Sequence, residues 1–444
     1  MTAESSLERF RALVRIPTIS RTDESTTDWA PFDEFLAALP RLYPALHAVL
    51  ERELVEGYSM LYRWRGETDG APAVLMAHYD VVHATEEGWT HPPFAAEIVG
   101  EGADAVLWGR GTLDDKGALV SILEAVERLV VEGFTPRSDV YLSFGHNEET
   151  AGGGAAAAVA LLESRGIRPA LVLDEGGAVV EGIFPGVAGP IAVIGVSEKG
   201  IASVELSVVQ EGGHASTPPR HSATWRLARA IVRLNAKAFP ASFSSATLEM
   251  VRTLGGRATG PLGVASRHLW LTRRALLTVF SRLGEETSAM VRTTQVVTEL
   301  SGSQAANAMA ETATATVNIR IAVGSTVDDT IRRVRSAIHD PLVTIAVQHG
   351  SEPSPISPTS GEAWELIRSA IQHTHPGTIV TPYIMLAASD GRHFAEISDH
   401  VYRFSPFEMS EAERGTLHAV NERIHTSTFL RGIEFYRTLL STRG

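Results

Sequence analysis

The sequence predicts an α/β protein built on a mostly parallel β-sheet, with a smaller α+β domain inserted into it. In the first half of the chain, short apolar runs alternate with helical patterns, and each run ends in a cluster of acids and histidines. From about residue 200 to 350, alternating strands with one polar face replace that pattern. A chain of 444 residues also exceeds the usual size of a single core, which favours two domains.

Three apolar runs, at 73–77, 140–144 and 170–173, are typical of buried parallel strands. A helical pattern with one apolar face runs from 115 to 131, and Gly133 supplies a stop. Alternating strands and helices predict helices on both faces of the sheet. In such sheets functional groups collect beyond the carboxyl ends of the strands, which is where the acids and histidines lie here.

The middle of the chain has alternating stretches at 203–209, 313–323 and 343–347, and helical stretches at 222–236 and 327–338. Strands with one polar face beside two helices indicate a small α+β domain.

We therefore divide the chain into a main domain of residues 1–199 and 351–444 and an inserted domain of residues 200–350. An apolar, basic segment at 267–283 lies inside the insertion. We expect it to be a packing helix or an oligomer contact in preference to a helix on a membrane surface.

Composition narrows the possible partners and ligands. The net charge of −13, from 52 acidic and 39 basic residues, disfavours nucleic acid or an anionic membrane as the main partner. Without cysteine, any metal site must use His, Asp and Glu. The first 17 residues lack the pattern of a signal peptide, and no apolar run approaches the roughly 18 residues of a membrane span. We expect a cytoplasmic protein with no nucleic-acid or membrane partner.

Two motifs follow the first strand. His78 and Asp80 lie on the same side of an extended segment, as in sites where a carboxylate orients a metal-binding imidazole. A core or surface histidine is the simpler explanation of that tripeptide alone. The nonapeptide GRGTLDDKG at 109–117 is more specific, since a plain acidic helix cap explains one aspartate but not the whole string.

Paired acids follow the next two strands. Glu148 and Glu149 precede a glycine run, so one could bind a metal while its neighbour accepts a proton from water. Asp174 and Glu175 have the same setting. Solvated charge pairs would also explain both.

In order, these motifs resemble those of the dizinc metallopeptidase family of aminoacylases, carboxypeptidase S and glutamate carboxypeptidases. The motifs are HxDV, GRGxxDDKG, EExxGG, LDEGG and a late histidine in HAVNER, at residues 418–423. The resemblance extends from RIPTIS at 15–20 to His418. The strings LDEGGAV, EKG, EPSP and RHLWL are most similar to the carboxypeptidase S (Gly-Xaa carboxypeptidase) branch.

The resemblance implies two Zn²⁺ ions per subunit, with Co²⁺ or Mn²⁺ as possible substitutes. One ion would be bound by His78 and Asp174 and the other by Glu149 and His418, with Asp114 bridging both. The peptide bond after Asp114 is expected to be cis. In the LDEGG string, Asp174 is preferred over its neighbour Glu175 as the ligand.

The resemblance also implies three catalytic residues. Glu148 would be the general base that deprotonates a bridging water and returns the proton to the leaving amine, while Asp80 orients His78. His214, in GGHASTPP, would reach the active site of a partner subunit and stabilise the oxyanion. We therefore expect a homodimer formed through the inserted lid domain.

Asn307, Arg320 and Arg392 match family positions near the substrate. Arg392 could bind the substrate carboxylate as a bidentate fork or form a structural salt bridge, and the sequence leaves both open. The region around 350–353 lacks the arginine of glutamate-specific members, which disfavours a dedicated glutamate pocket.

The resemblance implies a hydrolase that cleaves an amide bond next to a free carboxylate, as a carboxypeptidase or an N-acyl-amino-acid amidohydrolase. Its substrate would be a small peptide or an N-acyl amino acid. The alternative is a catalytically silent relative that serves as a binding or dimer scaffold. Because every expected ligand and the base are present, we favour the enzyme.

Overall fold

The large sheet is organised around four parallel strands, which lie side by side in the order β6, β3, β7 and β15. Their bounds are Ser138–Gly145, Thr68–His78, Leu171–Asp174 and Val401–Arg403 in the computed structural model, which describes residues 2–184 and 186–443. The three apolar runs fall within β3, β6 and β7. The predicted α/β class with a mostly parallel sheet is therefore confirmed at the centre of the fold.

Antiparallel pairs extend this sheet on both sides. On one side β2 pairs with β6, and β1 pairs with β2. On the other, β9 runs antiparallel to β15 and β8, while β14 joins β9 in parallel and β16 joins β8. These strands are β1 (Glu51–Val55), β2 (Ser59–Trp64), β8 (Val179–Val180), β9 (Ile191–Glu198), β14 (Ile379–Met385) and β16 (Glu408–Met409).

Helices cover both faces of the central strands. Alternate side chains of a strand point to opposite faces, and here Leu75 and Val74 enter two different apolar cores. The first core lies under α1, α2, α3, α4, α12 and α15, and the second under α5 and α13. These helices are α1 (Ala3–Val14), α2 (Ala30–Leu42), α3 (Pro44–Val49), α4 (Lys116–Val131), α5 (Gly154–Ser164), α12 (Glu362–Thr374), α13 (Gly391–Phe394) and α15 (Thr426–Thr442).

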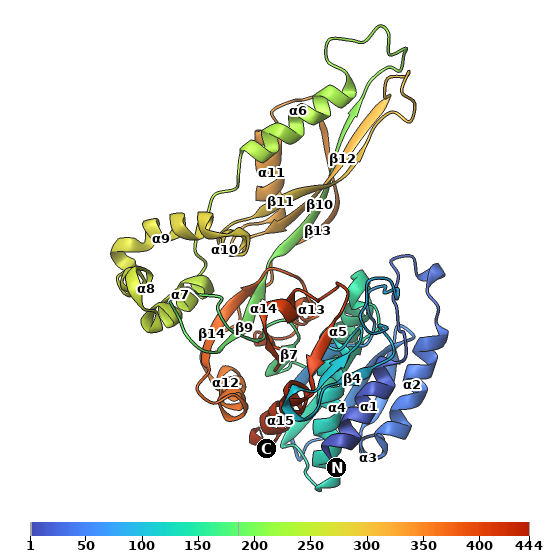
Figure 1. Ribbon diagram of the computed structural model, residues 1–444, viewed down its shortest axis with the longest axis vertical. Helices are drawn as coiled ribbons and strands as arrows, with labels where there is room; N and C mark the ends of the chain where they lie inside the picture. Colours follow the sequence, from blue (N-terminus) through green and yellow to red (C-terminus); the bar gives the residue numbers. More distant parts are fainter. Residues whose placement is uncertain (1, 185, 444) are drawn as a thin grey trace.

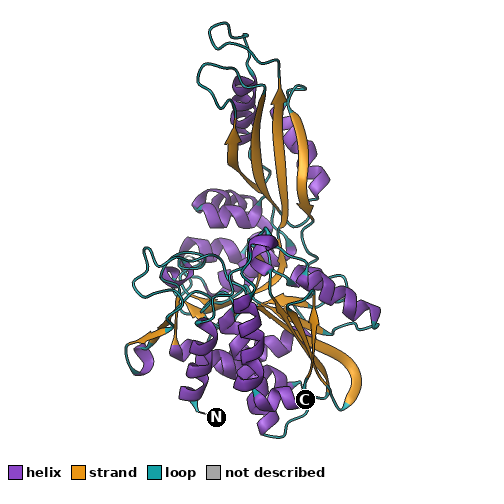
Figure 2. Cartoon of the chain, turned by 90° about the vertical axis from the view of Figure 1, so that its right-hand side faces the viewer, coloured by secondary structure: helices purple, strands orange, loops and turns teal. Residues whose placement is uncertain are grey.

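A second, antiparallel sheet projects from the main body in the order β11, β12, β10 and β13 (Figures 1 and 2). Its strands are Thr294–Ser301, Thr312–Ile321, Gly200–Val209 and Thr344–Ser351. Helices α6 (Ala223–Ala236) and α11 (Val327–Ile338) pack on one face and share an apolar core with it. This sheet and its two helices are called the lid below.

The connection between the two sheets is short, since β9 ends at Glu198 and β10 begins at Gly200. Four further helices do not join the lid core: α7 (Ser245–Arg257), α8 (Gly260–Arg267), α9 (Leu269–Leu283) and α10 (Glu285–Val291). They pack with Ile191 and Val193 of β9 and with Tyr383 of β14, at the side of the large sheet. The domain boundaries at 199 and 350 therefore stay a prediction.

Among the described residues, no helix combines the length and the apolar character needed to cross a bilayer.

The parallel core yields a stability prediction. Leu142 in β6 is fully buried, whereas Leu342 in the lid is 62% exposed. Truncating a buried leucine removes apolar contacts and leaves a cavity, so Leu142→Ala should lower the free energy of unfolding by about 2–5 kcal/mol. The matched change Leu342→Ala should stay within about 0.5 kcal/mol of the unchanged protein. Denaturant unfolding of both variants is the measurement, and equal losses would contradict this packing.

Candidate active site

Five separate segments bring acids and histidines to the carboxyl ends of the central strands. His78 is the last residue of β3, and Glu148 begins a short 3₁₀ turn directly after β6. Asp174 ends β7, Asp114 lies in the loop before α4, and His418 lies in the loop between α14 (Glu411–Arg414) and β17 (Arg423–His425). The parallel sheet therefore gathers at one edge residues that are up to 340 positions apart in sequence.

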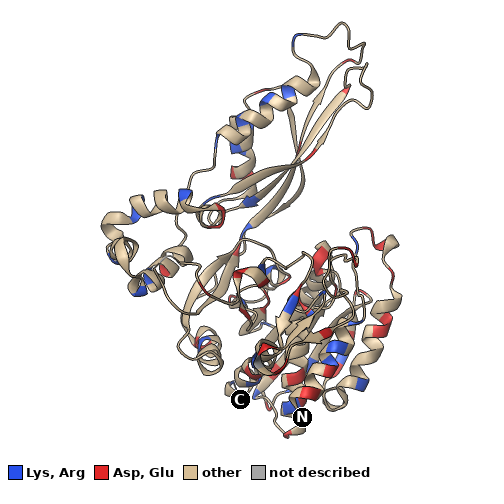
Figure 3. Cartoon of the chain, in the orientation of Figure 1, with Lys and Arg blue, Asp and Glu red and all other residues tan. Residues whose placement is uncertain are grey.

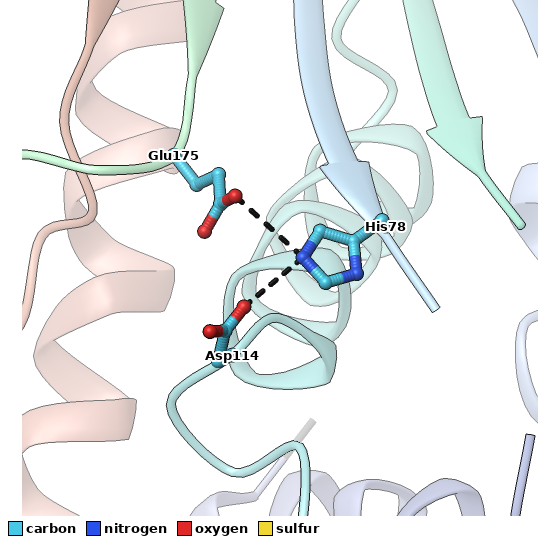
Figure 4. A group of neighbouring side chains, drawn as sticks. All are labelled: His78, Asp114 and Glu175. Carbon is cyan, nitrogen blue, oxygen red and sulfur yellow. Dashed lines mark hydrogen bonds and ion pairs between the residues drawn. The ribbon is translucent and has the colours of Figure 1, made fainter. Parts of the chain in front are cut away.

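Two overlapping groups share the Asp114 carboxylate. In the first, His78 Nε2 lies 3.0 Å from Asp114 Oδ1 and 3.6 Å from Glu175 Oε1 (Figure 4). In the second, His418 Nε2 lies 3.0 Å from Asp114 Oδ2 and 3.1 Å from Glu149 Oε2. Within each group the three potential ligand atoms lie within 4.8 Å of one another. Either group could hold a metal ion, with Asp114 between them.

The preference for Asp174 over Glu175 as a ligand stays a prediction, and the side chains of the two residues lie differently in the structure. Asp174 Oδ2 accepts a hydrogen bond from the backbone N–H of Gly391 at 2.6 Å, so this carboxylate anchors the 389–393 loop. Glu175 is the residue whose carboxylate joins His78 and Asp114. Adjacent residues at a strand end point in different directions, and the LDEGG string alone does not say which one faces the neighbouring strand.

Asp80 orients both the histidine and the acids of the next strand. His78 Nδ1 lies 3.0 Å from the main-chain oxygen of Asp80, which can only accept, so Nδ1 donates and Nε2 is the nitrogen that faces Asp114. The buried Asp80 carboxylate accepts from the backbone N–H groups of Glu148 and Glu149 at 3.2 and 3.1 Å. It also accepts from Ser20 at 2.7 Å. The Asp80 carboxylate thus fixes the backbone of the two glutamates, while its main-chain oxygen fixes the His78 ring.

Glu422 holds the loop of Asp114 against the loop of His418. This fully buried carboxylate accepts from the backbone N–H of Gly111, Leu113 and Asp114 at 2.8–3.2 Å, and it pairs with Arg110 at 2.7 Å. Sequence reasoning gave Glu422 no role. Its only signal was its place in the HAVNER string, because the partner residues lie more than 300 positions earlier.

Three further features of the GRGTLDDKG loop concern its conformation and its attachment to the rest of the fold. Gly111 has φ +88°, a left-handed conformation that favours glycine. The peptide bond between Asp114 and Asp115 is cis, as predicted. The buried Lys116 ammonium donates to the main-chain oxygens of Leu13 and Ile16 at 3.1 and 2.5 Å, which ties the loop to the end of α1.

The charges of the site are poorly balanced by the protein alone. Burial and the nearby Asp114 carboxylate raise the pKa of Glu175 to about 7. Burial and the Glu175 charge also raise the pKa of Glu148 well above its usual range. Glu149 Oε1 is buried and has no hydrogen-bond partner among the described residues. Bound cations would offset this crowding, and His and carboxylate donors without thiolate suit zinc, cobalt or manganese.

The pKa values of the two histidines are raised as well, which in their case favours the charged form. Hydrogen bonds to Asp114 and Glu149 raise the pKa of His418 to about 10. Burial disfavours protonation of His78, but hydrogen bonds with Asp114 and Asp80 outweigh it and raise the pKa of His78 well above its usual value. Without a cation, both imidazoles therefore hold protons at neutral pH.

His214 and Asn307 lie far from these groups in the same chain. They belong to the loops at 210–222 and 302–311, at the end of the lid remote from the large sheet (Figure 1). The two loops contact each other, since the backbone N–H of Ala215 donates to the Asn307 oxygen at 3.0 Å. The structure brings these two residues together but not to the acids at the strand ends.

Arg320 and Arg392 lie close together at the base of the lid. Arg392 Nε is 2.8 Å from Glu198 Oε1, so the structural salt bridge considered for this residue is present. Glu198 also pairs with Arg403 at 3.0 Å and accepts from the backbone N–H of Ser389. Burial and the positive charge of Arg392 lower the pKa of Arg320. Two cationic groups near each other form a suitable place for a carboxylate.

Comparisons with known proteins agree with this geometry. A family model described as Peptidase family M20/M25/M40 matches residues 74–442. The N-fatty-acyl-amino acid synthase/hydrolase PM20D1 of Xenopus tropicalis is 34% identical over 441 residues, covering 98% of this chain and 85% of that protein. Carboxypeptidase S of Saccharomyces cerevisiae is 28% identical over 496 residues, covering 97% of this chain and 83% of that protein.

Solved structures share the fold at low sequence identity. The M20 family metallo-carboxypeptidase Sso-CP2 from Sulfolobus solfataricus superimposes with a TM-score of 0.69 and 16% identity, covering 99% of both chains. Human carnosine dipeptidase 1 gives a TM-score of 0.67 with 14% identity, covering 99% of this chain and 96% of that one. At this identity the similarity concerns the fold alone.

The raised histidine pKa values predict that metal binding releases protons. Imidazole binds a metal only when neutral, so at pH 7 loading should displace at least one proton per chain, and affinity should increase with pH. The number released should fall as the pH approaches 10, the pKa of His418. Calorimetric titration of metal-free protein with Zn²⁺, in buffers of different ionisation enthalpy, measures this number. A heat that does not depend on the buffer would contradict the prediction.

Proposed function

We propose a function from one premise: the chain belongs to peptidase family M20/M25/M40. It is a metallohydrolase that cleaves an amide bond adjacent to a free carboxylate. Within that class we propose N-acyl amino acids as the preferred substrates, because the PM20D1 relatives are more similar to this chain than carboxypeptidase S is. Dipeptides with a free C-terminus are the second candidate, supported by carboxypeptidase S.

The observation that carries the proposal is the pair of residue groups that share Asp114. His78 and Glu175 would hold one divalent cation, Glu149 and His418 a second, and Asp114 both. When bound, two cations supply charge neutralisation, polarise the scissile carbonyl and lower the pKa of a water molecule. We propose Zn²⁺ for both positions, on the donor types alone.

Glu148 is the proposed general base. It belongs to neither group, yet its Oε2 lies 4.0 Å from His78 Nε2, beside the shared centre. A carboxylate that is not occupied as a ligand can accept a proton from the attacking water and return it to the leaving amine nitrogen. The backbone bond from Glu148 to Asp80 fixes the base relative to His78.

The two arginines at the lid base are the proposed site for the substrate carboxylate. The Nε atom of Arg392 pairs with Glu198, and Nη2 makes only a long contact of 3.5 Å with the main-chain oxygen of Lys199. The terminal nitrogens can therefore bind a ligand. A carboxylate between Arg392 and Arg320 would relieve their mutual repulsion. A substrate held there by its free carboxylate would have its amide bond positioned by that anchor.

We propose that His214 acts in the site of a partner subunit. Its loop, together with Asn307, lies at the end of the lid away from the acids of the same chain, so a second chain in a homodimer would have to supply it. There a histidine could donate to the developing oxyanion.

A cytoplasmic location also remains a prediction.

The function is tested by metal content and a substrate panel. The panel holds acetyl and long-chain N-acyl amino acids together with dipeptides of varied C-terminal residue. We expect two metal ions per chain, activity that is lost on chelation and restored by Zn²⁺, and hydrolysis of the acyl amino acids. Glu148→Gln should keep both ions and lower kcat by about 10²–10⁴-fold. Absence of tight metal binding and of turnover after adding Zn²⁺ or Co²⁺ would favour the silent scaffold.

The trans role of His214 is tested by mixing two inactive variants. In a heterodimer of Glu148→Gln and His214→Ala chains, one of the two sites would combine an intact Glu148 with an intact His214. We expect about half of the activity of the unchanged dimer to return. A heterodimer verified by mass spectrometry that stays as inactive as its parents would exclude the exchange.

A further inference from the structure

Residues 250–284 have a local charge opposite to that of the chain. The chain carries a net charge of −13, yet this stretch contains no acid and six arginines: Arg252, Arg257, Arg267, Arg273, Arg274 and Arg282. The stretch covers most of α7 (Ser245–Arg257), α8 (Gly260–Arg267) and α9 (Leu269–Leu283). Within the described part of the chain, none of the six forms an ion pair. Positive charge here is therefore not neutralised by the protein itself.

The same helices expose large apolar side chains. Trp270 is 84% exposed and Leu271 is 70% exposed, at the start of α9. The opposite side of α9 packs within the chain, since Leu276 and Phe280 are buried in the core beside β9 and β14. The exposed residues are thus not needed for packing within this chain. A helix in contact only with water would not require tryptophan and leucine among its arginines.

These residues form one projecting surface. Helices α8 and α9 lie at the side of the molecule, away from the strands of the lid (Figure 1), and blue basic positions mark them (Figure 3). Acidic positions are concentrated instead on the main body (Figure 3). The α8–α9 surface is defined here by its exposed arginines and apolar residues: Val264, Arg267, Trp270, Leu271, Arg273, Arg274, Val279, Arg282 and Leu283.

We propose that the α8–α9 surface adsorbs to an anionic lipid bilayer. Arginine guanidinium groups pair with lipid phosphates, while tryptophan and leucine enter the boundary between headgroups and acyl chains. The four arginines of this surface, none of which forms an ion pair within the described part of the chain, give the required charge complementarity. The acidic main body would be repelled by the same lipids, which fixes the orientation.

Adsorption would also bear on substrate access. N-acyl amino acids with long chains are amphiphiles that partition into bilayers, so a chain resting on a bilayer would meet them at high local concentration. This consequence rests on the proposed function, but the adsorption itself does not. The sequence predicts no membrane partner, and it predicts that residues 267–283 form a packing helix or an oligomer contact. The first prediction followed from the net charge, which does not describe this segment, and only one side of α9 packs within the chain.

The test is co-sedimentation of the full chain with vesicles of equal phosphatidylglycerol and phosphatidylcholine, compared with phosphatidylcholine alone. We expect binding to the anionic vesicles that weakens strongly between 50 and 500 mM salt, and little binding to the neutral ones. Arg273→Gln/Arg274→Gln/Arg282→Gln and, separately, Trp270→Ala/Leu271→Ala should each lower the partition coefficient at least tenfold. No binding of the unchanged chain to anionic vesicles at low salt would overturn the proposal.

Two controls separate local from general effects. Arg41→Gln/Lys237→Gln/Arg335→Gln removes the same charge from exposed positions elsewhere and should leave vesicle binding within twofold. Hydrolysis of a short, soluble acetyl amino acid should be unchanged in all variants, which keeps this result independent of the catalytic proposal. If the control variant lost as much vesicle binding as the α9 arginine variant, binding would not depend on the α8–α9 surface and the proposal would be wrong. Lower oligomer mass in the α9 variants with vesicle binding intact would identify a protein contact and refute the lipid proposal.

Discussion

The central constraint on this fold is mutual repulsion among carboxylates gathered at one edge of a parallel sheet. Asp114, Glu148, Glu149 and Glu175 come within a few ångströms of two histidines, and no lysine or arginine pairs with any of them among the described residues. Like charges at this distance, in surroundings poor in water, disfavour ionisation, as the raised pKa values of Glu148 and Glu175 express. These four carboxylates can therefore be fully ionised together only when cations are bound. The contacts of the surrounding residues hold the four side chains in place.

The supporting contacts come mostly from backbone and buried charge. Asp80 binds the N–H groups of the turn that carries Glu148, and Glu422 binds three N–H groups of the loop that carries Asp114. Lys116 ties that loop to the end of the first helix. Each anchor joins segments far apart in the sequence. Removing one would leave buried polar groups without partners, which costs about 1–3 kcal/mol for each and would loosen the acids they hold.

The sequence allowed the strands, the helix after Asp114 and most of the clustered residues to be predicted, because apolar periodicity and motif order are local properties. His78, Asp114, Glu149 and His418 were all named as ligands, and the structure brings them together. The choice between Asp174 and Glu175 depends on the direction of one side chain at the end of β7, which the LDEGG string does not specify. Glu422 and Glu198 were overlooked for a related reason: their partners, Gly111 and Arg392, are distant in sequence, and no local pattern marks such a pairing.

Charge in this molecule is separated by location, so the net value of −13 describes none of its functional surfaces. Acids dominate the ends of the central strands, where the reacting amide bond is expected. Arginines gather at the lid base, and Glu198, two positions before the lid begins, holds two of them by ion pairs. A substrate with a neutral amide and an anionic end would span from the first region to the second. The α8–α9 surface is a third charged region, which is positive and faces solvent. Partners are therefore selected by the local sign of charge at each surface, which overall composition cannot predict.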